Sequence, residues 1–305
     1  MNSYDPLFHS GWVEFNKAYW GLDAEVLEFG PKKGTSWELK TVKYTNKKGQ
    51  LVIPPRNPHI PVEFSSSSNK PSSYNRRKRL AIQEMASYYA ERKVKGGVNL
   101  SPVVNDVRPF QWCGMEASPR YTYHIDIHEY SSRMDSSVLN KARKAEKLGY
   151  SCCVTEDYTS VHECLMGPEQ RKGFDHSVSV EGLKLLSELM GEKFVCFIAV
   201  DNCGRPAGSW VRIYEPNGLA LAWSAGVKTS ALKDGVNNLL GKYALDYFAS
   251  KNCQVFDFVG ANIPPVAEMK EAWGGDLVCY YTVRHQSIRN IARTAYLLAK
   301  QYLKK

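Results

Sequence analysis

The stretch VFDFVGANIPPVAEMKEAWGGDLVCYYTV, residues 255–283, carries the pattern that decides the fold. It opens on an apolar run typical of a buried strand, and the segment after the double proline ends at Gly274 and Gly275. Proline near the start and glycine after the end are signals of a helix, here over 265–273. The aromatic run that follows predicts a strand, so the stretch predicts strand, helix and strand in succession.

The segment upstream, residues 132–254, predicts a regular order of elements. Three apolar runs joined by the short turns DNCGRP and EPNG predict an antiparallel meander over 194–226. Apolar residues at helical spacing predict helices before and after this meander. The expected helices cover 132–148, 158–165, 178–190 and 232–251, and a further strand covers 150–156.

The N-terminal part predicts a second set of elements. Patterns of aromatic and apolar residues predict helices over 8–20 and 74–93, a hairpin from 37 to 53, and strands near 98–104 and 120–127. Residues 54–73 are dense in Pro, Ser and Asn, which indicates a flexible loop. We therefore expect one domain over 1–127 and another over 128–305, the latter ending in a basic amphipathic helix over 287–305.

The composition and net charge indicate which kinds of partner and which cellular compartment to expect. The 305 residues are 43% hydrophobic, and 40 Lys plus Arg against 31 Asp plus Glu give a net charge of +9. Such an excess attracts anionic partners such as nucleotides, tRNA and CoA, although it also serves solubility. No signal peptide or membrane span is evident, so we expect a cytoplasmic protein. The eight cysteines show no ligand-like spacing, so we expect reduced thiols and no metal.

The expected order of elements over 132–284 resembles that of the GNAT fold. The segments RPFQWCGMEASPRYTYHIDI (108–127), LNKARKAEKLGY (139–150) and 255–283 further resemble the FemABX-like transferases, which contain two GNAT-like domains. The resemblance implies an α/β (α+β) protein with two GNAT-like acyltransferase domains, in which mixed, mostly antiparallel sheets are flanked by helices. It also implies transfer of an acyl or aminoacyl group to an amine, without a resident cofactor.

The donor differs between three hypotheses. GNAT enzymes that use acetyl-CoA carry a Gly-rich loop for the pyrophosphate after the fourth strand, whereas GVKTSALKDGV (226–236) stands there in this chain. The departure favours aminoacyl-tRNA as the donor and a peptidoglycan-precursor-type, nucleotide-linked amine as the acceptor. The alternatives are an acyl-CoA-dependent enzyme acting on an amino sugar or small amine, and a non-catalytic module that binds RNA or a nucleotide.

Three residues of the opening stretch are candidates for the chemistry. Lys270 matches the family lysine thought to stabilise charge in the transition state, and the alternative is a solvated helix lysine. If Lys270 is catalytic, we expect its replacement by Met to slow turnover and leave stability nearly unchanged. Asp257 lies in an apolar strand, where it would orient the amine or Lys270, or would cap the turn that includes Asn262.

Other residues are candidates for substrate binding. Lys141 and Arg143 could anchor a phosphate, or could belong to a solvated helix face. The basic run Arg76–Arg79 could contact a tRNA backbone, although an exposed helix start is the usual explanation of such a run. Trp112 and Tyr121 could stack on a base or line the acceptor channel, as matching positions do in the family, or could pack in a core.

Overall fold

The structure is a computed structural model that describes residues 5–31, 36–172 and 178–286. The chain forms two compact units, each built from separate segments. The large unit comprises Met1–Leu22, Pro54–Pro58 and Arg120–Cys279, and the small unit comprises Asp23–Ile53, His59–Pro119 and Tyr280–Lys305. These units differ from the contiguous halves expected over 1–127 and 128–305, because strands β6 (Met115–Asp126) and β12 (Asp276–His285) each run from one unit into the other.

The large unit is built on one mixed sheet. Its strands follow the order β12-β6-β11-β10-β9-β8-β7. The pair formed by β10 and β11 is parallel, whereas β6–β11, β7–β8, β8–β9 and β9–β10 are antiparallel. The strands not yet bounded are β7 (Ser151–Val154), β8 (Phe194–Val200), β9 (Pro206–Tyr214), β10 (Leu219–Val227) and β11 (Val255–Asp257).

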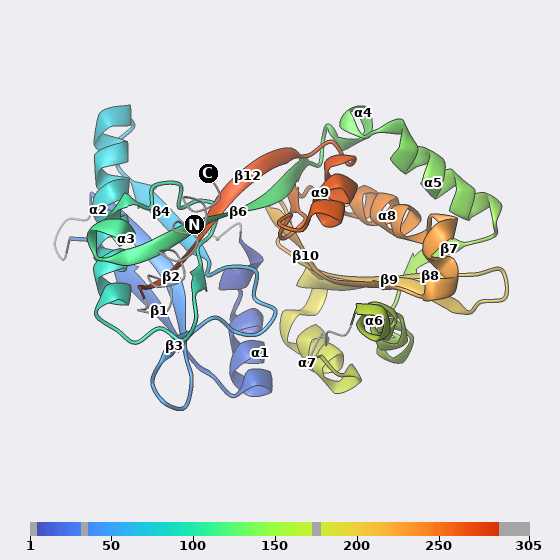
Figure 1. The fold of residues 1–305 in the computed structure, drawn as a ribbon, viewed down its shortest axis with the longest axis horizontal. Helices are drawn as coiled ribbons and strands as arrows, with labels where there is room; N and C mark the ends of the chain where they lie inside the picture. Colours follow the sequence, from blue (N-terminus) through green and yellow to red (C-terminus); the bar gives the residue numbers. More distant parts are fainter. Residues whose placement is uncertain (1–4, 32–35, 173–177, 287–305) are drawn as a thin grey trace, which may run out of the picture. The chain divides into compact units, whose positions relative to one another are not determined.

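Helices cover both faces of this sheet, as Figure 1 shows for α8 and α5 on one face and α6 and α7 on the other. The elements are η1 (Pro6–Phe8), α1 (Ser10–Trp20), α4 (Tyr130–Arg133), α5 (Ser136–Lys147), α6 (Tyr158–Lys172), α7 (Val180–Met190), η2 (Gly191–Lys193), η3 (Thr229–Asp234), α8 (Val236–Ser250) and α9 (Pro264–Glu271). Strand β8 shows why two layers form. Val195 and Phe197 enter the core beside α8, and Phe194 and Cys196 enter the core beside α1 and α7.

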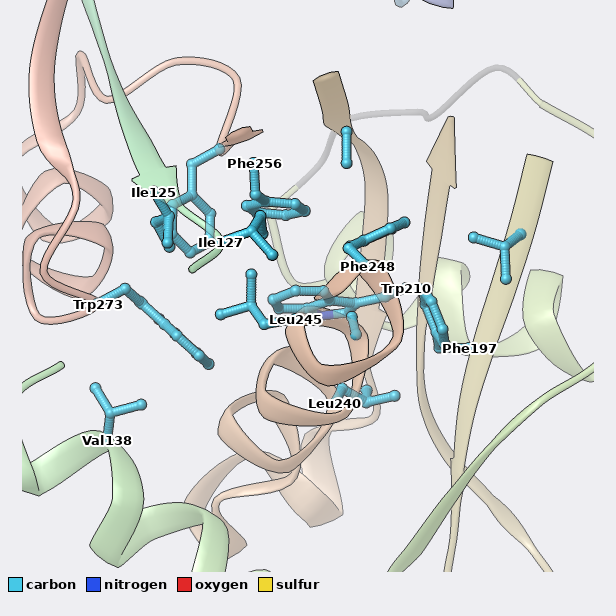
Figure 2. Packing of buried hydrophobic residues seen from close by; sticks show 14 of the residues in the cluster. Ile125, Ile127, Val138, Phe197, Trp210, Leu240, Leu245, Phe248, Phe256 and Trp273 are labelled. Atoms are coloured by element: carbon cyan, nitrogen blue, oxygen red, sulfur yellow. The ribbon is translucent and has the colours of Figure 1, made fainter. Parts of the chain in front are cut away.

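Aromatic rings fill the core between the sheet and α8 (Figure 2). Trp210 stacks on Phe256, with ring centroids 6.3 Å apart, and lies the same distance from Trp273. Gly241 of α8 makes room for these rings, because a Cβ there would lie 2.2 Å from the ring of Trp273. The helix that carries the candidate lysine is thereby attached to the core through Trp273.

The small unit contains a second sheet. β2 pairs antiparallel with β1, β3 and β4, and within this unit β5 pairs antiparallel with β12. Its elements are β1 (Asp23–Phe29), β2 (Trp37–Thr45), β3 (Leu51–Val52), β4 (Val62–Ser66), α2 (Pro71–Ala90), β5 (Val98–Asn99) and α3 (Arg108–Trp112). Residues such as Leu39, Ile82, Met85 and Phe110 form its core.

The mixed, mostly antiparallel sheets flanked by helices confirm the predicted fold class. The expectation of a flexible loop over 54–73 is wrong in two respects. It contains strand β4, and its residue Arg56 donates a hydrogen bond to the carbonyl of Trp223 over 2.9 Å. The expected helix over 287–305 lies outside the described residues. Among the described residues, no helix is both long and apolar enough to cross a lipid bilayer.

Candidate active site

The sheet of the large unit opens where β10 and β11 separate. The two strands pair from Leu219 with Val255 to Leu221 with Asp257, and β10 then continues alone on this side to Val227. Asp257 is therefore the last paired residue of β11, at the point of divergence.

Asp257 is 2% exposed and lies in a network of polar contacts. Thr122 Oγ1 and the Val259 backbone N–H donate to Asp257 Oδ1 over 2.5 and 2.7 Å. His124, the register partner of Asp257 on β6, places Nε2 3.4 Å from Oδ2. Burial raises the pKa of Asp257, but His124, Thr122 and the Val259 N–H outweigh burial and hold that pKa below its usual value. The carboxylate is therefore charged and held in place.

Lys270 reaches the turn that follows Asp257. Its Nζ donates to the carbonyl oxygens of Phe258, Val259 and Gly260 over 2.7, 3.2 and 2.5 Å. Val259 and Gly260 have φ values of 53° and 81°, so the turn directs successive carbonyls toward one point. The ammonium group thus donates to three carbonyl oxygens of one turn, in one buried and two partly buried contacts.

The surroundings of Lys270 also set its charge. The side chain is 9% exposed, so the alternative of a solvated helix lysine is wrong. Burial lowers the pKa of Lys270 to about 8, Asp257 opposes this shift and Arg212 adds to it. All three ammonium hydrogens are directed at carbonyls, so contact with a substrate would require exchange of one such bond. The catalytic role of Lys270 stays a prediction.

Arg212 is a second buried cation in this region. It is 2% exposed, and its Nη1 donates to the carbonyls of Val211 and Ser224 over 2.9 and 2.6 Å. Its guanidinium carbon lies 3.9 Å from the centre of the Trp210 ring. No carboxylate among the described residues pairs with it, and burial lowers its pKa well below the usual value. Arg212 and Lys270 therefore outweigh the single negative charge of Asp257.

The two glycines after α9 permit its close approach. A Cβ on Gly274 would lie 2.2 Å from the carbonyl oxygen of Arg133, and one on Gly275 would lie 2.9 Å from that of His124. Gly274 also has φ 73°, which L side chains rarely adopt. The spacing of Lys270, Gly274 and Gly275 therefore reflects how α9 sits beside β6.

We expect Gly274→Ala to lower the free energy of unfolding by about 2 to 5 kcal/mol, because it combines left-handed strain with a backbone collision. Thermal or urea unfolding followed by circular dichroism would measure this. Gly204→Ala is the matched control, since Gly204 has φ 75° but nothing within 4 Å of its Cβ position. Equal losses for the two variants would show that the collision contributes nothing.

The other candidates are placed as follows. Asn262 Oδ1 accepts from the Tyr121 N–H over 2.9 Å, and its Nδ2 donates to the Tyr121 carbonyl over 3.2 Å, so this amide fastens the turn to β6. The Tyr121 ring is 40% exposed. Lys141 and Arg143 lie on the exposed face of α5, and neither forms a hydrogen bond or ion pair with the described part of the Asp257 network. Trp112 belongs to the small unit.

The sequence interpretation did not select Thr122, His124 or Arg212. Thr122 and His124 lie two residues apart on one face of β6, and polar residues inside the otherwise β-rich run YTYHIDI were the available signal. Only the cross-strand register assigns His124 to Asp257. Arg212 offered a similar signal, a charge inside the apolar run SWVRIY.

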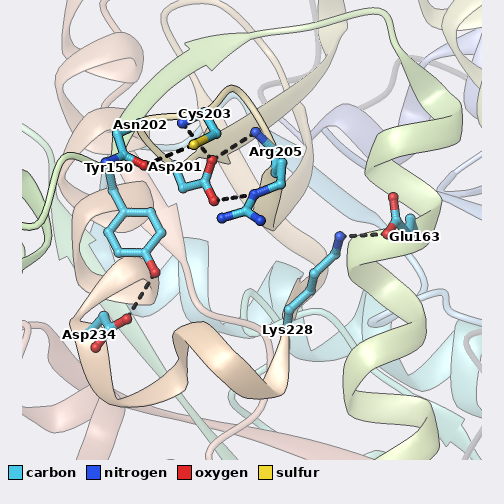
Figure 3. A network of polar contacts seen from close by, with 8 residues as sticks. All are labelled: Tyr150, Glu163, Asp201, Asn202, Cys203, Arg205, Lys228 and Asp234. Carbon is cyan, nitrogen blue, oxygen red and sulfur yellow. Dashed lines mark hydrogen bonds and ion pairs between the residues drawn. The ribbon is translucent and has the colours of Figure 1, made fainter.

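The loop after β10 is held at both ends (Figure 3). Lys228 Nζ forms an ion pair with Glu163 Oε1 at 2.5 Å, and the hydroxyl of Tyr150 donates to Asp234 Oδ2 over 2.9 Å. These contacts join the loop to α6 and to the start of β7.

Helix α5 also closes against this loop. A Cβ on Gly235 would lie 2.0 Å from the carbonyl oxygen of Lys141, and Lys144 Nζ donates to the carbonyl of Lys233 over 2.6 Å. The start of α8 thus faces a carbonyl oxygen, whose partial negative charge disfavours a phosphate. The described part of the chain also holds no cluster of His, Cys, Asp and Glu fit for a metal ion.

The fold resembles that of several solved structures. The sequence matches no protein-family model and no curated protein. The structure is similar to FemX, with a TM-score of 0.64 and 11% identity over 91% of this chain and 92% of that chain. The predicted FemABX-like fold is thereby confirmed.

Two further structures show the same fold. The C-terminal domain of a putative lysylphosphatidylglycerol synthetase from Agrobacterium fabrum has a TM-score of 0.56 and 8% identity, covering 92% of this chain and 89% of that chain. L-PGS from Bacillus licheniformis has a TM-score of 0.53 and 13% identity, covering 92% and 90%. At these identities the likeness concerns the fold.

Proposed function

We propose that this protein is an acyltransferase that moves an acyl or aminoacyl group onto an amine where β10 and β11 separate. The observation that carries the proposal is the pair formed by Asp257 and His124. The Asp257 side chain is 3% exposed and that of His124 is 26% exposed, so a fixed carboxylate faces the buried Nε2 of an imidazole whose other atoms are partly exposed. The fold shared with FemX supports the same class of reaction.

His124 serves as the general base in this proposal. The acceptor nitrogen attacks the carbonyl carbon of the donor, and His124 takes the proton that the nitrogen loses. Asp257 orients the imidazole and stabilises its charged form. When the intermediate collapses, the carbon–oxygen bond of the donor ester breaks and the imidazolium returns the proton to the leaving oxygen. An amide bond replaces the ester bond.

The buried cations stabilise the negative charge that develops on the carbonyl oxygen. Arg212 and Lys270 exceed Asp257 by one positive charge in a region with little water, where electrostatic effects are strong. We assign Lys270 two contributions, its charge and its hold on the turn 258–260. Lys141, Arg143, Trp112, Tyr121 and Asn262 stay proposals for acceptor binding.

We propose a charged tRNA as the donor and a nucleotide-linked, peptidoglycan-precursor-type amine as the acceptor. The support is the loop after β10, which is tied to α5 and α6 and presents the carbonyl of Lys141 where a pyrophosphate would need N–H donors. Both substrates of this reaction occur in the cytoplasm, where we place the protein. The proposed reaction needs no metal or resident cofactor.

Mass spectrometry would test the donor. Purified protein is incubated with candidate amines and either total charged tRNA or a panel of acyl-CoA thioesters. We expect product with charged tRNA, steeply reduced between about 50 and 200 mM salt because several phosphate contacts are lost together. Product that depends on a CoA thioester would support the acyl-CoA enzyme instead. If no product forms with charged tRNA or with any acyl-CoA thioester, the result would favour the non-catalytic module.

A further inference from the structure

The small unit contains a cavity of about 610 Å³ whose lining includes no residue of the Asp257 network. It lies between α2, the segment that leads into α3, and the part of β12 that belongs to this unit. Most of its lining residues are polar or charged. The lining residues are Asn75, Arg76, Lys78, Arg79, Ile82, Asn105, Asp106, Val107, Arg108 and Tyr281.

Four cations and one carboxylate line this cavity. Asp106 is already neutralised, because Arg108 Nε and Nη2 donate to its two oxygens over 2.8 Å each. Arg76, Lys78 and Arg79 form no ion pair with any described residue. Four cations and one carboxylate thus leave the described lining of the cavity with an excess of positive charge.

The spacing along α2 gathers these cations on one side. Arg76 and Arg79 lie three residues apart, and Ile82 follows after three more, so all three share a helix face. Arg77 points elsewhere, since its Nη1 donates to the Ser36 carbonyl and the Ser66 hydroxyl over 3.1 and 3.2 Å. One arginine of the run is thus used for structure, and its neighbours are left for a ligand.

Partial burial makes the charge of Lys78 costly without an anion, whereas the neighbouring Arg76 is exposed. Lys78 is only partly exposed, and burial lowers its pKa, although the charge of Asp106 opposes this shift. Like charges that converge in a cavity repel one another, and an anion would relieve both effects. Amide donors of Asn75 and Asn105 add neutral hydrogen-bonding capacity in the same walls.

An exposed aromatic ring adjoins the charged wall. Trp112 is 57% exposed, and the guanidinium carbons of Arg79 and Arg108 each lie 5.8 Å from the centre of its ring. These contacts hold the indole beside two cavity residues. A flat apolar surface next to convergent cations is suited to a ligand that carries both a ring and an anionic group.

We propose that this cavity binds the phosphate or pyrophosphate group of a small-molecule ligand. Arginine forks and a lysine are the side chains that recognise phosphate oxygens best. The volume of about 610 Å³ falls within the range of small-molecule sites. A nucleic-acid backbone is instead followed by cations spread along an open groove. The proposal does not depend on the acyl-transfer reaction.

Calorimetry on the full chain at about 50 mM salt would test it, with inorganic pyrophosphate, ADP, UDP and a single-stranded RNA decamer as probes. We expect pyrophosphate or the nucleoside diphosphates to bind. The double variant Arg76→Gln/Arg79→Gln should weaken that binding by about 10-fold to 100-fold, since each lost charge-assisted contact is substantial. Tighter binding of ADP or UDP than of pyrophosphate would identify a nucleotide, and equal affinities would identify the phosphate group alone.

The matched control is Lys47→Gln/Lys48→Gln, which removes the same charge from an exposed turn of the small unit. Its affinities should equal those of the wild type. If the control lost as much affinity as Arg76→Gln/Arg79→Gln, the effect would come from the net charge of the protein and not from the cavity, and the proposal would be overturned. The proposal would also be overturned if only the RNA decamer bound. It would be overturned as well if the correctly folded protein bound no probe, or if Arg76→Gln/Arg79→Gln left the binding unchanged.

Discussion

Lys270→Met should lose both stability and turnover. Methionine replaces the buried stem, but the carbonyls of Phe258, Val259 and Gly260 lose their donor. A buried acceptor left without a partner costs about 1 to 3 kcal/mol. The contact to Phe258 is buried and those to Val259 and Gly260 are partly buried, so the total should be about 2 to 5 kcal/mol. The sequence alone led us to expect little change in stability, which the burial of Lys270 contradicts.

The turnover of Lys270→Met should fall by about 100-fold to 1,000-fold with little change in KM, because a charge that acts in the transition state contributes little to substrate binding. Rates are compared at a temperature where the variant is folded. Lys270→Arg should recover part of the loss. Lys147→Met, on the exposed face of α5, is the control. Wild-type turnover in folded Lys270→Met would remove Lys270 from the reaction.

The stability of the wild type should also depend on pH through Lys270. The pKa of Lys270 is about 8 in the folded protein, against an ordinary value of 10.5 that applies to the unfolded chain. Between pH 8 and pH 10.5 the amine is therefore protonated in the unfolded chain and largely neutral in the folded protein. The free energy of unfolding of the wild type, relative to Lys270→Met, should therefore rise with pH across this window, by at most about 1.4 kcal/mol per pH unit. A flat difference would show that the buried amine keeps its ordinary pKa.

The sequence predicted the elements of the large unit well because its helices and strands follow local patterns of apolar residues. The meander over 194–226 and the strand, helix and strand of 255–283 appear as β8 to β12 with α9. Strand β4 was missed because Pro, Ser and Asn surround its short run, and what makes it a strand is pairing with β2. Such pairing depends on residues distant in sequence.

The candidate site was predicted in part, for a similar reason. Asp257 stood out as a charge in an apolar strand, and Lys270 through its resemblance to a family position. The sequence near Lys270 does not show which carbonyls it binds, because these converge through the positive φ values of Val259 and Gly260. The pairing of Asp257 with His124 has no local sequence pattern either, because it depends on the register between β6 and β11. Likewise, Arg76 and Arg77 look equivalent in sequence, and only the fold separates a cavity residue from one that fastens β4.

Asp257→Asn and His124→Gln should each lower turnover by about 100-fold to 10,000-fold, the range expected when a general base is lost or wrongly oriented. Asparagine keeps the size of Asp257 and can still accept from Thr122, but it loses the charge that stabilises an imidazolium. Single-turnover rates with the donor that the mass-spectrometry experiment identifies would measure the loss. His128→Gln is the control, since His128 is exposed and lies beyond the end of β6.

The double variant Asp257→Asn/His124→Gln distinguishes a catalytic pair from two independent structural contributions. Residues that act as a unit lose their effect together, so the double variant should be about as slow as the slower single variant. Losses that multiply would assign the general base to another residue and leave Asp257 as a carboxylate that only supports the turn after β11.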